Sequence, residues 1–448
     1  MTAPRPWSAS SWRDRQVLQQ PEYPTGVDIE GVLDDLRRRP PLVHPGEIDS
    51  LKEQLARAAA GERFVLQGGD CAERFQDCDA RAIEDKLKIL LQMSLVLTWG
   101  ARTPVVRVAR MAGQYAKPRS KPTETVGGRE IPTYRGDIVS GHDPADRTPD
   151  PGRMLEAYGR SAATLNYARA LGEGGFADLH HPHHWDLAFV KSTAHRRDYE
   201  DMVERILDAL DFVETTGVRA GHALRTVDLF TSHEGLLLAY EEAMTRPVGD
   251  RSYNVGTHFL WIGDRTRQLE GAHVEYFRGL ANPIGLKISP TLDPDELVAL
   301  VRRLDPGGEP GRITLITRYG ADRIAECLPR HRAAIDRARL GVLWSCDPMH
   351  GNTVSTESGV KTRQFGRILD ELRSAFTIHE EAGGRLGGVH FELTGDDVTE
   401  CVGGPQDLSE ADLARRYQTF CDPRLNYAQS LELAFLVARH LQASRQRC

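Results

Sequence analysis

The sequence has no apolar run long enough to cross a membrane and no apolar segment of the signal-peptide type near its start. A membrane-spanning helix needs about 20 consecutive apolar residues, and a signal peptide needs a continuous apolar core. Residues 1–20 contain arginines and tryptophans instead. We therefore expect a soluble, cytoplasmic protein without a membrane partner.

Cysteine is sparse and positive charge is not in excess. The 448 residues include seven cysteines without regular spacing, so we expect no disulfide scaffold, and individual thiols remain available for chemistry. The formal net charge is −7, whereas a protein that binds nucleic acid normally presents a broad basic surface. Nucleic acid is therefore not expected as a partner, and the basic residues must act locally.

Short apolar runs alternate with helix-like segments from about residue 64 onward, which is the pattern of a parallel sheet with helical crossovers. Eight of these runs are convincing, and eight is a number of strands that closes a barrel. They are Phe64–Gln67, Val105–Ala109, Thr226–Phe230, His258–Ile262, Ile284–Ile288, Ile313–Thr317, Gly341–Ser345 and Gly388–Glu392. The sequence therefore predicts an α/β fold of the (β/α)8 (TIM) barrel class.

The barrel is expected to occupy residues 61–448, after an N-terminal extension of residues 1–60. Prolines interrupt the extension, and residues 47–60 predict one amphipathic helix, so we expect a role in packing or assembly. An inserted helical segment is expected near residues 150–200, where the connection between the second and third runs is unusually long. The segment 120–150 is rich in proline, glycine and charge, which is typical of a surface loop.

Polar residues follow nearly every predicted strand, and in barrels of this kind ligands bind at the carboxyl ends of the strands. In chain order, the residues at or just after the eight ends include Cys71, Arg110, Glu234, Arg265, Lys287, Arg318, His350 and Glu392. A scaffold selected for stability alone would not repeat this placement. We therefore expect a ligand-binding or catalytic site at this end of the barrel.

A metal site is predicted at the same end. The candidate ligands are Cys71, His350, Glu392 and Asp422. A thiolate, an imidazole and two carboxylates together suit one borderline divalent ion such as manganese, iron, cobalt or zinc. Taken singly, a cysteine is more often buried packing and a histidine more often a structural residue. The prediction rests on their placement, because the chain shows no compact pattern of paired ligands.

A second histidine cluster, His180–His184, gives a competing hypothesis. It contains a His-x-His pair, His181 and His183, after the apolar run Phe176–Leu179, an arrangement typical of metal-dependent hydrolases. The eight strands are complete without that run, and a hydrolase would not explain the cations at the other strand ends. A hydrolase is therefore kept only as a remote alternative.

The segment Val106–Ser120 runs from an apolar strand directly into three cations. Guanidinium groups match the paired oxygens of a carboxylate or phosphate, and a lysine adds a compact point charge. Together with cations at other strand ends, the full set is Arg110, Lys117, Arg119, Arg265, Lys287 and Arg318. This set exceeds what one phosphate needs, and two anionic substrates oriented against each other would account for it.

Five motifs are specific enough to compare with known families. They are Gln67–Glu73 (QGGDCAE), Gly113–Ser120 (GQYAKPRS), Trp261–Gln268 (WIGDRTRQ), Cys346–Asn352 (CDPMHGN) and Cys421–Asn426 (CDPRLN). They resemble the type II 3-deoxy-D-arabino-heptulosonate 7-phosphate (DAHP) synthases over roughly residues 45–440. The resemblance implies a metal-dependent (β/α)8 transferase that condenses phosphoenolpyruvate with erythrose 4-phosphate. This reaction is the entry to the shikimate pathway, which leads to chorismate and the aromatic amino acids.

The resemblance assigns a role to each candidate residue. It implies that the metal ligands are Cys71, His350, Glu392 and Asp422. It assigns phosphoenolpyruvate to Arg110, Arg265, Lys287 and Arg318, and erythrose 4-phosphate to Lys117, Arg119 and Ser120. Lys117 would donate a proton to the aldehyde oxygen as the enol carbon attacks, so that the catalytic set is Lys117, Cys71 and His350. Water then adds to the former enol carbon and phosphate leaves.

Two residues next to these motifs need separate treatment. Asp264 stands where the family commonly has glutamate before the arginine, so no side-chain role is carried over to it. Cys421 precedes the expected ligand Asp422. If Cys421 lies close to Cys71, oxidation could join the two thiols and remove a metal ligand.

Other functions stay open at this point. An amino-DAHP synthase of secondary metabolism would need the same cations and metal, with an amino or imino sugar phosphate as its second substrate. A non-catalytic paralogue that binds phosphosugars would be expected to lack some of the four ligands, and none is missing. For each of these functions we expect a homodimer or a homotetramer.

Overall fold

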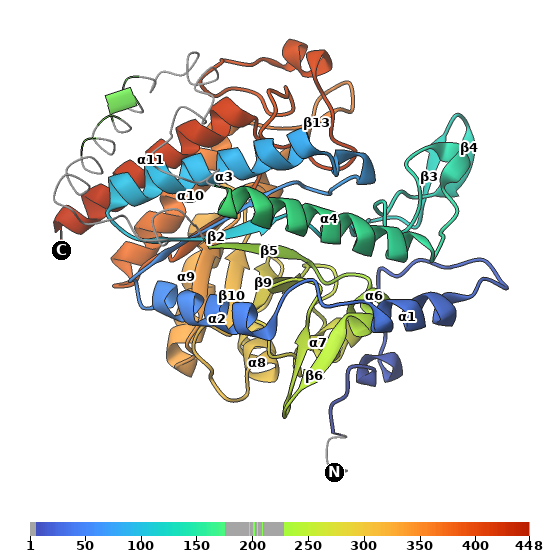
Figure 1. Ribbon diagram of the computed structural model, residues 1–448. Coiled ribbons are helices and arrows are strands. Elements are labelled where there is room, and N and C mark those ends of the chain that lie inside the picture. The colour runs from blue at the N-terminus through green and yellow to red at the C-terminus, as the bar shows by residue number, and fades with distance from the viewer. Residues whose placement is uncertain are drawn as a thin grey trace.

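A computed structural model describes residues 6–174 and 228–447, together with Arg197, Glu200, Asp201, Glu204 and Asp208. Its centre is a closed barrel of eight parallel strands in the order β1-β14-β11-β10-β9-β8-β5-β2 (Figure 1). The strands are β1 Phe64–Gly69, β2 Val105–Arg110, β5 Leu229–Glu234, β8 Phe259–Ile262, β9 Ile284–Ile288, β10 Ile313–Thr317, β11 Leu343–Cys346 and β14 Gly388–Glu392. Every predicted run overlaps one of these strands, so the predicted TIM barrel is confirmed.

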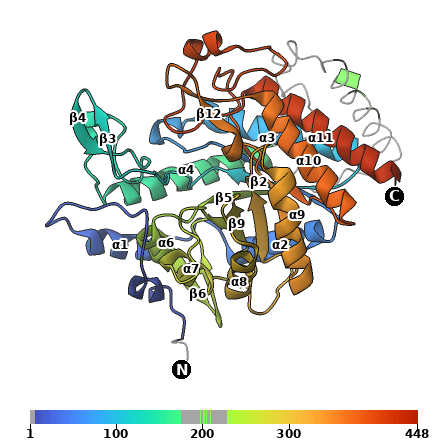
Figure 2. The ribbon, with the colours of Figure 1, turned by 180° about the vertical axis from the view of Figure 1, so that it is seen from behind.

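Helices pack around the barrel. They are α1 Ile29–Arg38, α2 Pro45–Ala59, α3 Ala80–Ala101, α4 Arg153–Glu173, α6 Leu238–Ala243, α7 Ala272–Phe277, α8 Pro294–Leu304, α9 Ile324–Ala338, α10 Phe365–Glu381 and α11 Tyr427–Arg447. α3 and α11 lie side by side on one flank in both views (Figures 1 and 2). In α8, the Asp293 side chain caps the first turn by accepting hydrogen bonds from the backbone of Asp295 and Glu296. Its apolar stripe is buried, as expected for a helix with one face on the barrel.

Helix α2, from the N-terminal extension, packs into one end of the barrel. Its residues Leu51, Leu55 and Ala58 share a buried cluster with barrel residues such as Trp261. Ala58 lies next to Gly387, which directly precedes β14, so α2 sits where the strands begin. The helix predicted at residues 47–60 is therefore confirmed, and it fills the end of the barrel opposite the expected site.

The segment 120–150 contains a β-hairpin, so the prediction of a loop was wrong for part of it. β3 (Thr123–Val126) pairs antiparallel with β4 (Arg129–Pro132), and the hairpin projects from the body in both views (Figures 1 and 2). Gly127 and Gly128 at its tip have φ values of 57° and 79°. Glycine adopts this left-handed region without strain, which allows a tight turn between the two short strands.

Among the described residues, two further hairpins lie in the connections between barrel elements, and short 3-10 turns occur both before the first barrel strand and in these connections. The hairpins are β6 Thr245–Val248 with β7 Arg251–Asn254, and β12 Thr353–Ser355 with β13 Lys361–Arg363. The turns are η1 Ser11–Asp14, η2 Phe75–Asp77, η3 Pro144–Asp146, η7 His350–Asn352 and η8 Glu410–Arg415. Lys361, the first residue of β13, lines the candidate site, so hairpin β12–β13 forms part of its wall.

The third barrel strand lies farther along the chain than predicted. The apolar run suggested Thr226–Phe230, but β5 begins at Leu229 and extends to Glu234; Thr226 is outside the described residues. Ser232 lies beyond the predicted run but is buried, and its hydroxyl donates to the Ala109 carbonyl at 3.0 Å. A polar side chain with a partner is tolerated inside the barrel, so polarity did not mark the end of the strand.

Two expectations concern segments outside the barrel strands. Helix α4 occupies the first part of the expected 150–200 insertion, whereas the histidine cluster His180–His184 lies outside the described residues. Among the helices that the structure describes, none combines the length and the apolar character needed to span a bilayer.

Candidate active site

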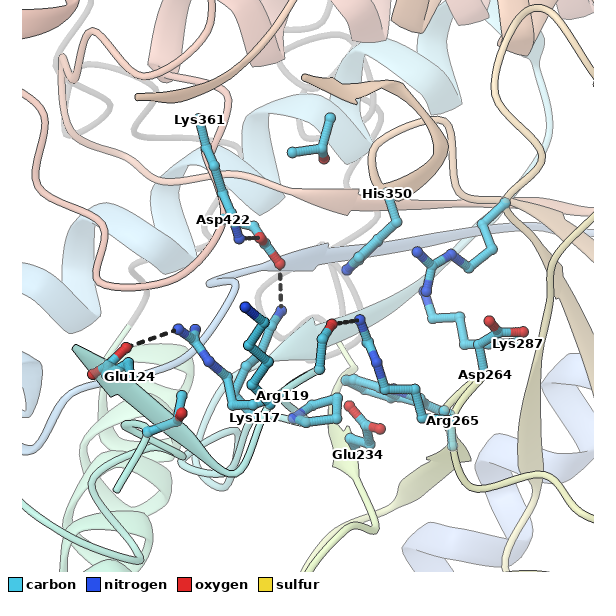
Figure 3. Close-up of a pocket in the computed structure, with 18 of the residues that line it drawn as sticks. Lys117, Arg119, Glu124, Glu234, Asp264, Arg265, Lys287, His350, Lys361 and Asp422 are labelled. Atoms are coloured by element: carbon cyan, nitrogen blue, oxygen red, sulfur yellow. Dashed lines mark hydrogen bonds and ion pairs between the residues drawn. The ribbon is translucent and has the colours of Figure 1, made fainter. Parts of the chain in front are cut away.

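A cavity of about 460 Å³ opens at the carboxyl ends of the barrel strands (Figure 3). The predicted site residues that line it are Arg110, Lys117, Arg119, Ser120, Arg265, Lys287, Arg318, His350 and Asp422. The two others, Cys71 and Glu392, are fully buried and contact Lys117. The fold thus brings all of them together, although 351 positions separate Cys71 from Asp422.

Three of the four candidate metal ligands form a compact group. One ligand atom from each of Cys71, Glu392 and Asp422 lies within 4.8 Å of the others. The fourth candidate reaches the same group, since Nε2 of His350 lies 3.1 Å from Oε1 of Glu392. Thiol, imidazole and carboxylate donors this close together fit a borderline divalent cation. The residues present therefore suit the expected metal.

The candidate ligands are held at the mouth of the barrel by the elements that precede them. Cys71 follows β1, whose last residue, Gly69, has a φ of 144°. A Cβ on Gly69 would stand 2.6 Å from the Arg110 carbonyl oxygen, so any larger residue would push β1 away from β2. Glu392 is the last residue of β14, and His350 opens the turn after β11.

Lys117 lies at the centre of the ligand group. Its Nζ is 2.9 Å from Cys71 Sγ, and it is 3.3 Å from Oε1 of Glu392 and 3.3 Å from Oδ2 of Asp422. Burial alone would lower the pKa of Lys117, but the neighbouring Cys71 and Glu392 raise it well above its usual value. The ammonium therefore keeps its proton at neutral pH and offsets part of the negative charge around it.

Both candidate carboxylate ligands are ionised despite their burial. Burial would raise the pKa of Glu392, but His350 and Lys117 lower it well below its usual range. The pKa of Asp422 is also lowered, because the effect of Lys117 outweighs that of burial. Lys361 adds a second cation, 2.9 Å from Oδ1 of Asp422 (Figure 3). Ionised carboxylates are the forms that bind a metal.

The remaining two candidate ligands are neutral at neutral pH. Burial and a hydrogen bond with Cys421 raise the pKa of Cys71 well above its usual value. Burial lowers the pKa of His350, although Asp347 opposes that shift. Nδ1 of His350 lies 2.7 Å from Oδ2 of Asp347, which leaves Nε2 facing Glu392. A cation that binds here would take the place of the thiol proton.

Asp347 connects the ligand group to the neighbouring cations. Its Oδ1 accepts hydrogen bonds from the backbone of Met349 at 3.0 Å and His350 at 3.2 Å. Its Oδ2 also forms a buried ion pair with Lys287. Burial lowers the pKa of Lys287 to about 8, although Asp347 opposes the shift. Lys287 is therefore a cation at neutral pH that loses its charge in mild alkali.

Arg110 is almost entirely buried, and its guanidinium is already engaged. Its Nη2 donates to Oε1 of Glu392 at 2.9 Å and to the Cys71 carbonyl at 3.1 Å. Its Nε donates to the Asp70 carbonyl at 2.9 Å. The guanidinium also lies 5.1 Å from the ring centre of Trp261. Besides lining the cavity, Arg110 therefore ties the turn after β1 to the end of β14.

The other cations of the cavity have fewer partners. Arg265 is exposed, and its Nη2 donates to Oγ of Ser120 at 2.9 Å (Figure 3). Within the part of the chain that the structure describes, the buried Nε of Arg318 has no hydrogen-bond acceptor. Arg119 faces Glu124, with 3.7 Å between Nη2 and Oε2. Arg265 and Ser120 therefore join the two expected anion sites through one contact.

Two of the charged residues that line the cavity, Glu234 and Lys361, had no role assigned from the sequence. Glu234, the last residue of β5, is buried and has a raised pKa because of that burial. Its place at a strand end was a signal that could have identified it. Lys361 carried no such signal, because it reaches the cavity from hairpin β12–β13, which follows β11 and is not a barrel strand.

Asp264 and Cys421 lie next to functional residues and have distinct surroundings. Asp264 lines the cavity, but its carboxylate accepts a hydrogen bond from Nε of Arg267 at 3.0 Å, which helps to fix the turn that presents Arg265. Cys421 and Cys71 share a small buried cluster with Tyr134, and both cysteines are free. The two thiols of the redox hypothesis therefore lie in the same buried group.

Comparisons with known proteins give consistent results. The chain matches the Class-II DAHP synthetase family over residues 7–438. The phospho-2-dehydro-3-deoxyheptonate aldolase of Neurospora crassa is 51% identical over 458 residues, which cover 98% of this chain and 95% of that protein. The enzyme of the same name from Streptomyces coelicolor is 50% identical over 438 residues, with 97% of each chain covered. Phospho-2-dehydro-3-deoxyheptonate aldolase AroG of Mycolicibacterium smegmatis is 46% identical over 437 residues, covering 96% and 93% of the two chains.

Proposed function

The chain belongs to the class-II DAHP synthetase family, and from this premise we propose that its cavity condenses phosphoenolpyruvate with erythrose 4-phosphate to DAHP and phosphate. Relatives that share nearly the whole chain are named for this activity, the first step of the shikimate pathway. The observation that supports the proposal most is the contact between Arg265 and Ser120 at 2.9 Å. Arg265 belongs to the expected phosphoenolpyruvate site and Ser120 to the expected erythrose 4-phosphate site. Their contact therefore lies where the two sites would meet, in the cavity that also contains the candidate metal ligands His350 and Asp422.

We propose that the ligand group holds one divalent cation: manganese, cobalt, iron or zinc. The proposed ligands are Cys71, His350, Glu392 and Asp422. When bound, such a cation supplies Lewis-acid stabilisation of negative charge that develops on the aldehyde oxygen. The carboxylate of Glu392 is oriented from both sides, because Arg110 donates to Oε1 at 2.9 Å and Arg363 donates to Oε2 at 2.8 Å. Partners of this kind fix a ligand's direction and raise metal affinity.

The phosphoenolpyruvate site is proposed to lie around Arg265, Lys287 and Arg318, with Arg110 beneath it. Two anionic groups, a carboxylate and a phosphate, need several charge-assisted hydrogen bonds. Within the described residues, the buried Nε of Arg318 lacks an acceptor and the hydrogen bonds of exposed Arg265 are with the neutral residues Ser120 and Gln268. These two guanidinium groups are therefore available to a bidentate anion.

Erythrose 4-phosphate is proposed to bind at Lys117, Arg119 and Ser120. Arg119 and Ser120 lie on the loop after β2, where they can hold the phosphate away from the ligand group. Lys117 lies on the same loop but inside the ligand group. An extended sugar phosphate that bridges these positions would place its aldehyde near Lys117.

The reaction can be described by what these side chains do. C3 of phosphoenolpyruvate attacks the aldehyde carbon, and a carbon–carbon bond forms. The aldehyde oxygen gains the electron pair of its π bond, and the Lys117 ammonium donates a proton to it. Water then adds at the electron-deficient C2 and one of its protons restores the Lys117 ammonium. The bond between C2 and the phosphate oxygen breaks as the new hydroxyl becomes the ketone, and the remaining proton leaves with the phosphate. Lys117 suits this role because its Nζ lies among the candidate ligands, 2.9 Å from Cys71 Sγ and 3.3 Å from Oε1 of Glu392.

The test is an assay of the purified chain with phosphoenolpyruvate, erythrose 4-phosphate and Mn²⁺, with and without a chelator. We expect enolpyruvate loss and phosphate release in equal amounts, abolished by the chelator and restored by added metal. An absence of metal-dependent turnover would contradict the proposal. A clear preference for an amino or imino sugar phosphate over erythrose 4-phosphate would instead favour an amino-DAHP synthase.

A further inference from the structure

A second cavity, of about 780 Å³, lies at the opposite end of the barrel from the active site. Three of its walls are the connections that run into neighbouring strands: residues 61–63 before β1, 101–104 before β2 and 383–387 before β14. Helices α10 and α11 complete it. The cavity is therefore built from the amino ends of the strands and shares no lining residue with the active site.

The lining combines an apolar floor with an excess of positive charge. The main apolar residues are Phe64, Phe376, Leu386 and Leu441, and the cations are Arg63, Arg102, Arg385 and Arg445. The chain as a whole carries a formal net charge of −7. A cavity lined by four arginines therefore differs in charge from the chain as a whole. Positive groups that face a concave, partly apolar space focus their field into it.

None of the four arginines has a carboxylate partner among the residues that the structure describes. The Nε of Arg63 is buried and lacks an acceptor within the described ranges. Arg102 lies over the ring of Trp99, 4.1 Å from its centre, and its carbonyl accepts a hydrogen bond from Arg445 at 3.2 Å. Arg102, Arg385 and Arg445 are exposed, whereas the Nε of Arg63 is a buried donor of the kind that normally has an acceptor.

The two acidic residues of the lining are engaged elsewhere. Glu62 accepts a hydrogen bond from Nε of Arg57 at 2.9 Å. Glu380 accepts one from Nε2 of His440 at 3.0 Å and another from the Ser444 hydroxyl. Neither carboxylate therefore neutralises the arginines, and the cavity keeps a net positive charge.

We propose that this cavity is a binding site for a small organic carboxylate with an apolar body. The guanidinium groups of Arg63 and Arg385 would receive the carboxylate, because planar guanidinium groups match its two oxygens. The floor around Phe64 and Phe376 would cover the apolar part of the ligand. The volume is within the usual range for sites that bind small molecules, about 300–1,000 Å³.

The first experiment measures binding of defined probes to the full chain by calorimetry and ligand-observed NMR. Phenylacetate and hexanoate carry both features of the expected ligand, acetate carries only the charge, and benzyl alcohol carries only the apolar body. We expect saturable binding of the first two, with one site per chain that is independent of active-site occupancy, and at least tenfold weaker binding of the last two. Equal binding of all four, or no saturation at millimolar concentration, would overturn the proposal.

Substitutions locate the site. Arg63→Gln and Arg385→Gln should each weaken the binding of phenylacetate about tenfold or more, the usual effect of losing one charge-assisted hydrogen bond. Arg302→Gln is the matched control, because Arg302 is exposed on α8, outside both cavities. Arg63 is half-buried, so Arg385→Gln keeps the test valid if Arg63→Gln folds poorly.

A third variant distinguishes binding in the second cavity from binding in the active site. Its cations could also attract carboxylates, but a substitution there, Arg265→Gln, should leave phenylacetate affinity unchanged if the ligand occupies the second cavity. If Arg265→Gln abolishes binding and Arg385→Gln does not, the proposal is wrong. The readout is binding alone, so the result does not depend on whether the chain catalyses the proposed condensation.

Discussion

Nη1 of Arg424 donates a hydrogen bond to Oδ1 of Asp70 at 2.7 Å, inside the protein. Asp70 directly precedes Cys71, and Arg424 follows Asp422 by two residues. The pair therefore joins the two chain segments that supply a proposed thiol ligand and a proposed carboxylate ligand. Arg424 also forms an ion pair with Glu400 at 2.8 Å. The buried charges of Asp70 and Glu400 are therefore both compensated by Arg424.

We predict that Arg424→Gln weakens metal binding without removing a ligand. The change breaks the buried pair with Asp70, which costs about 3–5 kcal/mol of the free energy of unfolding. Because the segments that carry Cys71 and Asp422 lose their link, the metal dissociation constant should rise about 10–100-fold. Metal titration of the folded variant measures this change. Arg415→Gln, at an exposed arginine, is the control; equal metal affinities in the two variants would contradict the prediction.

Removal of the thiol should abolish metal-dependent turnover. Cys71→Ala deletes one of four proposed ligands and leaves Lys117 without a neighbour that it contacts at 2.9 Å. We expect a folded protein with little bound metal after dialysis and turnover reduced by at least about 100-fold. Cys78→Ala is a matched control, since Cys78 bonds to Thr164 and does not line the active site. Full activity of Cys71→Ala would overturn the ligand assignment.

The affinity for phosphoenolpyruvate should fall as the pH rises through about 8. Burial lowers the pKa of Lys287 to about 8, so the free protein loses this cation above that pH. An anion binds the charged form, and its affinity should therefore drop by up to about tenfold per pH unit above about 8. Direct binding measurements between pH 6.5 and 9.5 provide the test. Lys287→Arg should move the decline to higher pH, whereas an identical decline in that variant would assign it to another group.

Oxidation should reduce metal loading through Cys71 and Cys421. The two thiols lie in one buried cluster, and hydrogen peroxide would remove two electrons and two protons from them to form a disulfide and water. We expect peroxide to lower the metal content and a reductant to restore it. Cys421→Ser should protect the metal content from reversible loss. Metal loading that is insensitive to peroxide in the unsubstituted chain would contradict this prediction.

The sequence predicted the barrel because most of its strands contain a short apolar run. Runs such as Ile284–Ile288 and Ile313–Thr317 became β9 and β10 with the same bounds. The boundaries of β5 could not be predicted in the same way, because Ser232 and His233 are polar yet buried. They are tolerated through partners that are distant in sequence, such as the Ala109 carbonyl for Ser232. Pairing across the barrel is not visible in a local pattern.

The grouping of the candidate site residues could be expected for a similar reason. Residues at strand ends must meet at one face of a barrel, so the grouping of Cys71, Arg110 and Glu392 follows from topology. Lys361 could not be found in this way, because it lies in a hairpin that folds back over the mouth. The Arg424–Asp70 pair was equally invisible, since nothing near either residue indicates its partner.

The central claim is that one metal ion, held by Cys71, His350, Glu392 and Asp422, serves a site that joins two anionic substrates. The most direct test titrates the metal-free chain with Mn²⁺ and follows bound metal and DAHP formation in the same samples. The account predicts that turnover rises in proportion to bound metal, reaches its maximum at one ion per chain, and is lost in Cys71→Ala. Turnover in the metal-free chain, or full turnover in Cys71→Ala at equal metal concentration, would contradict it.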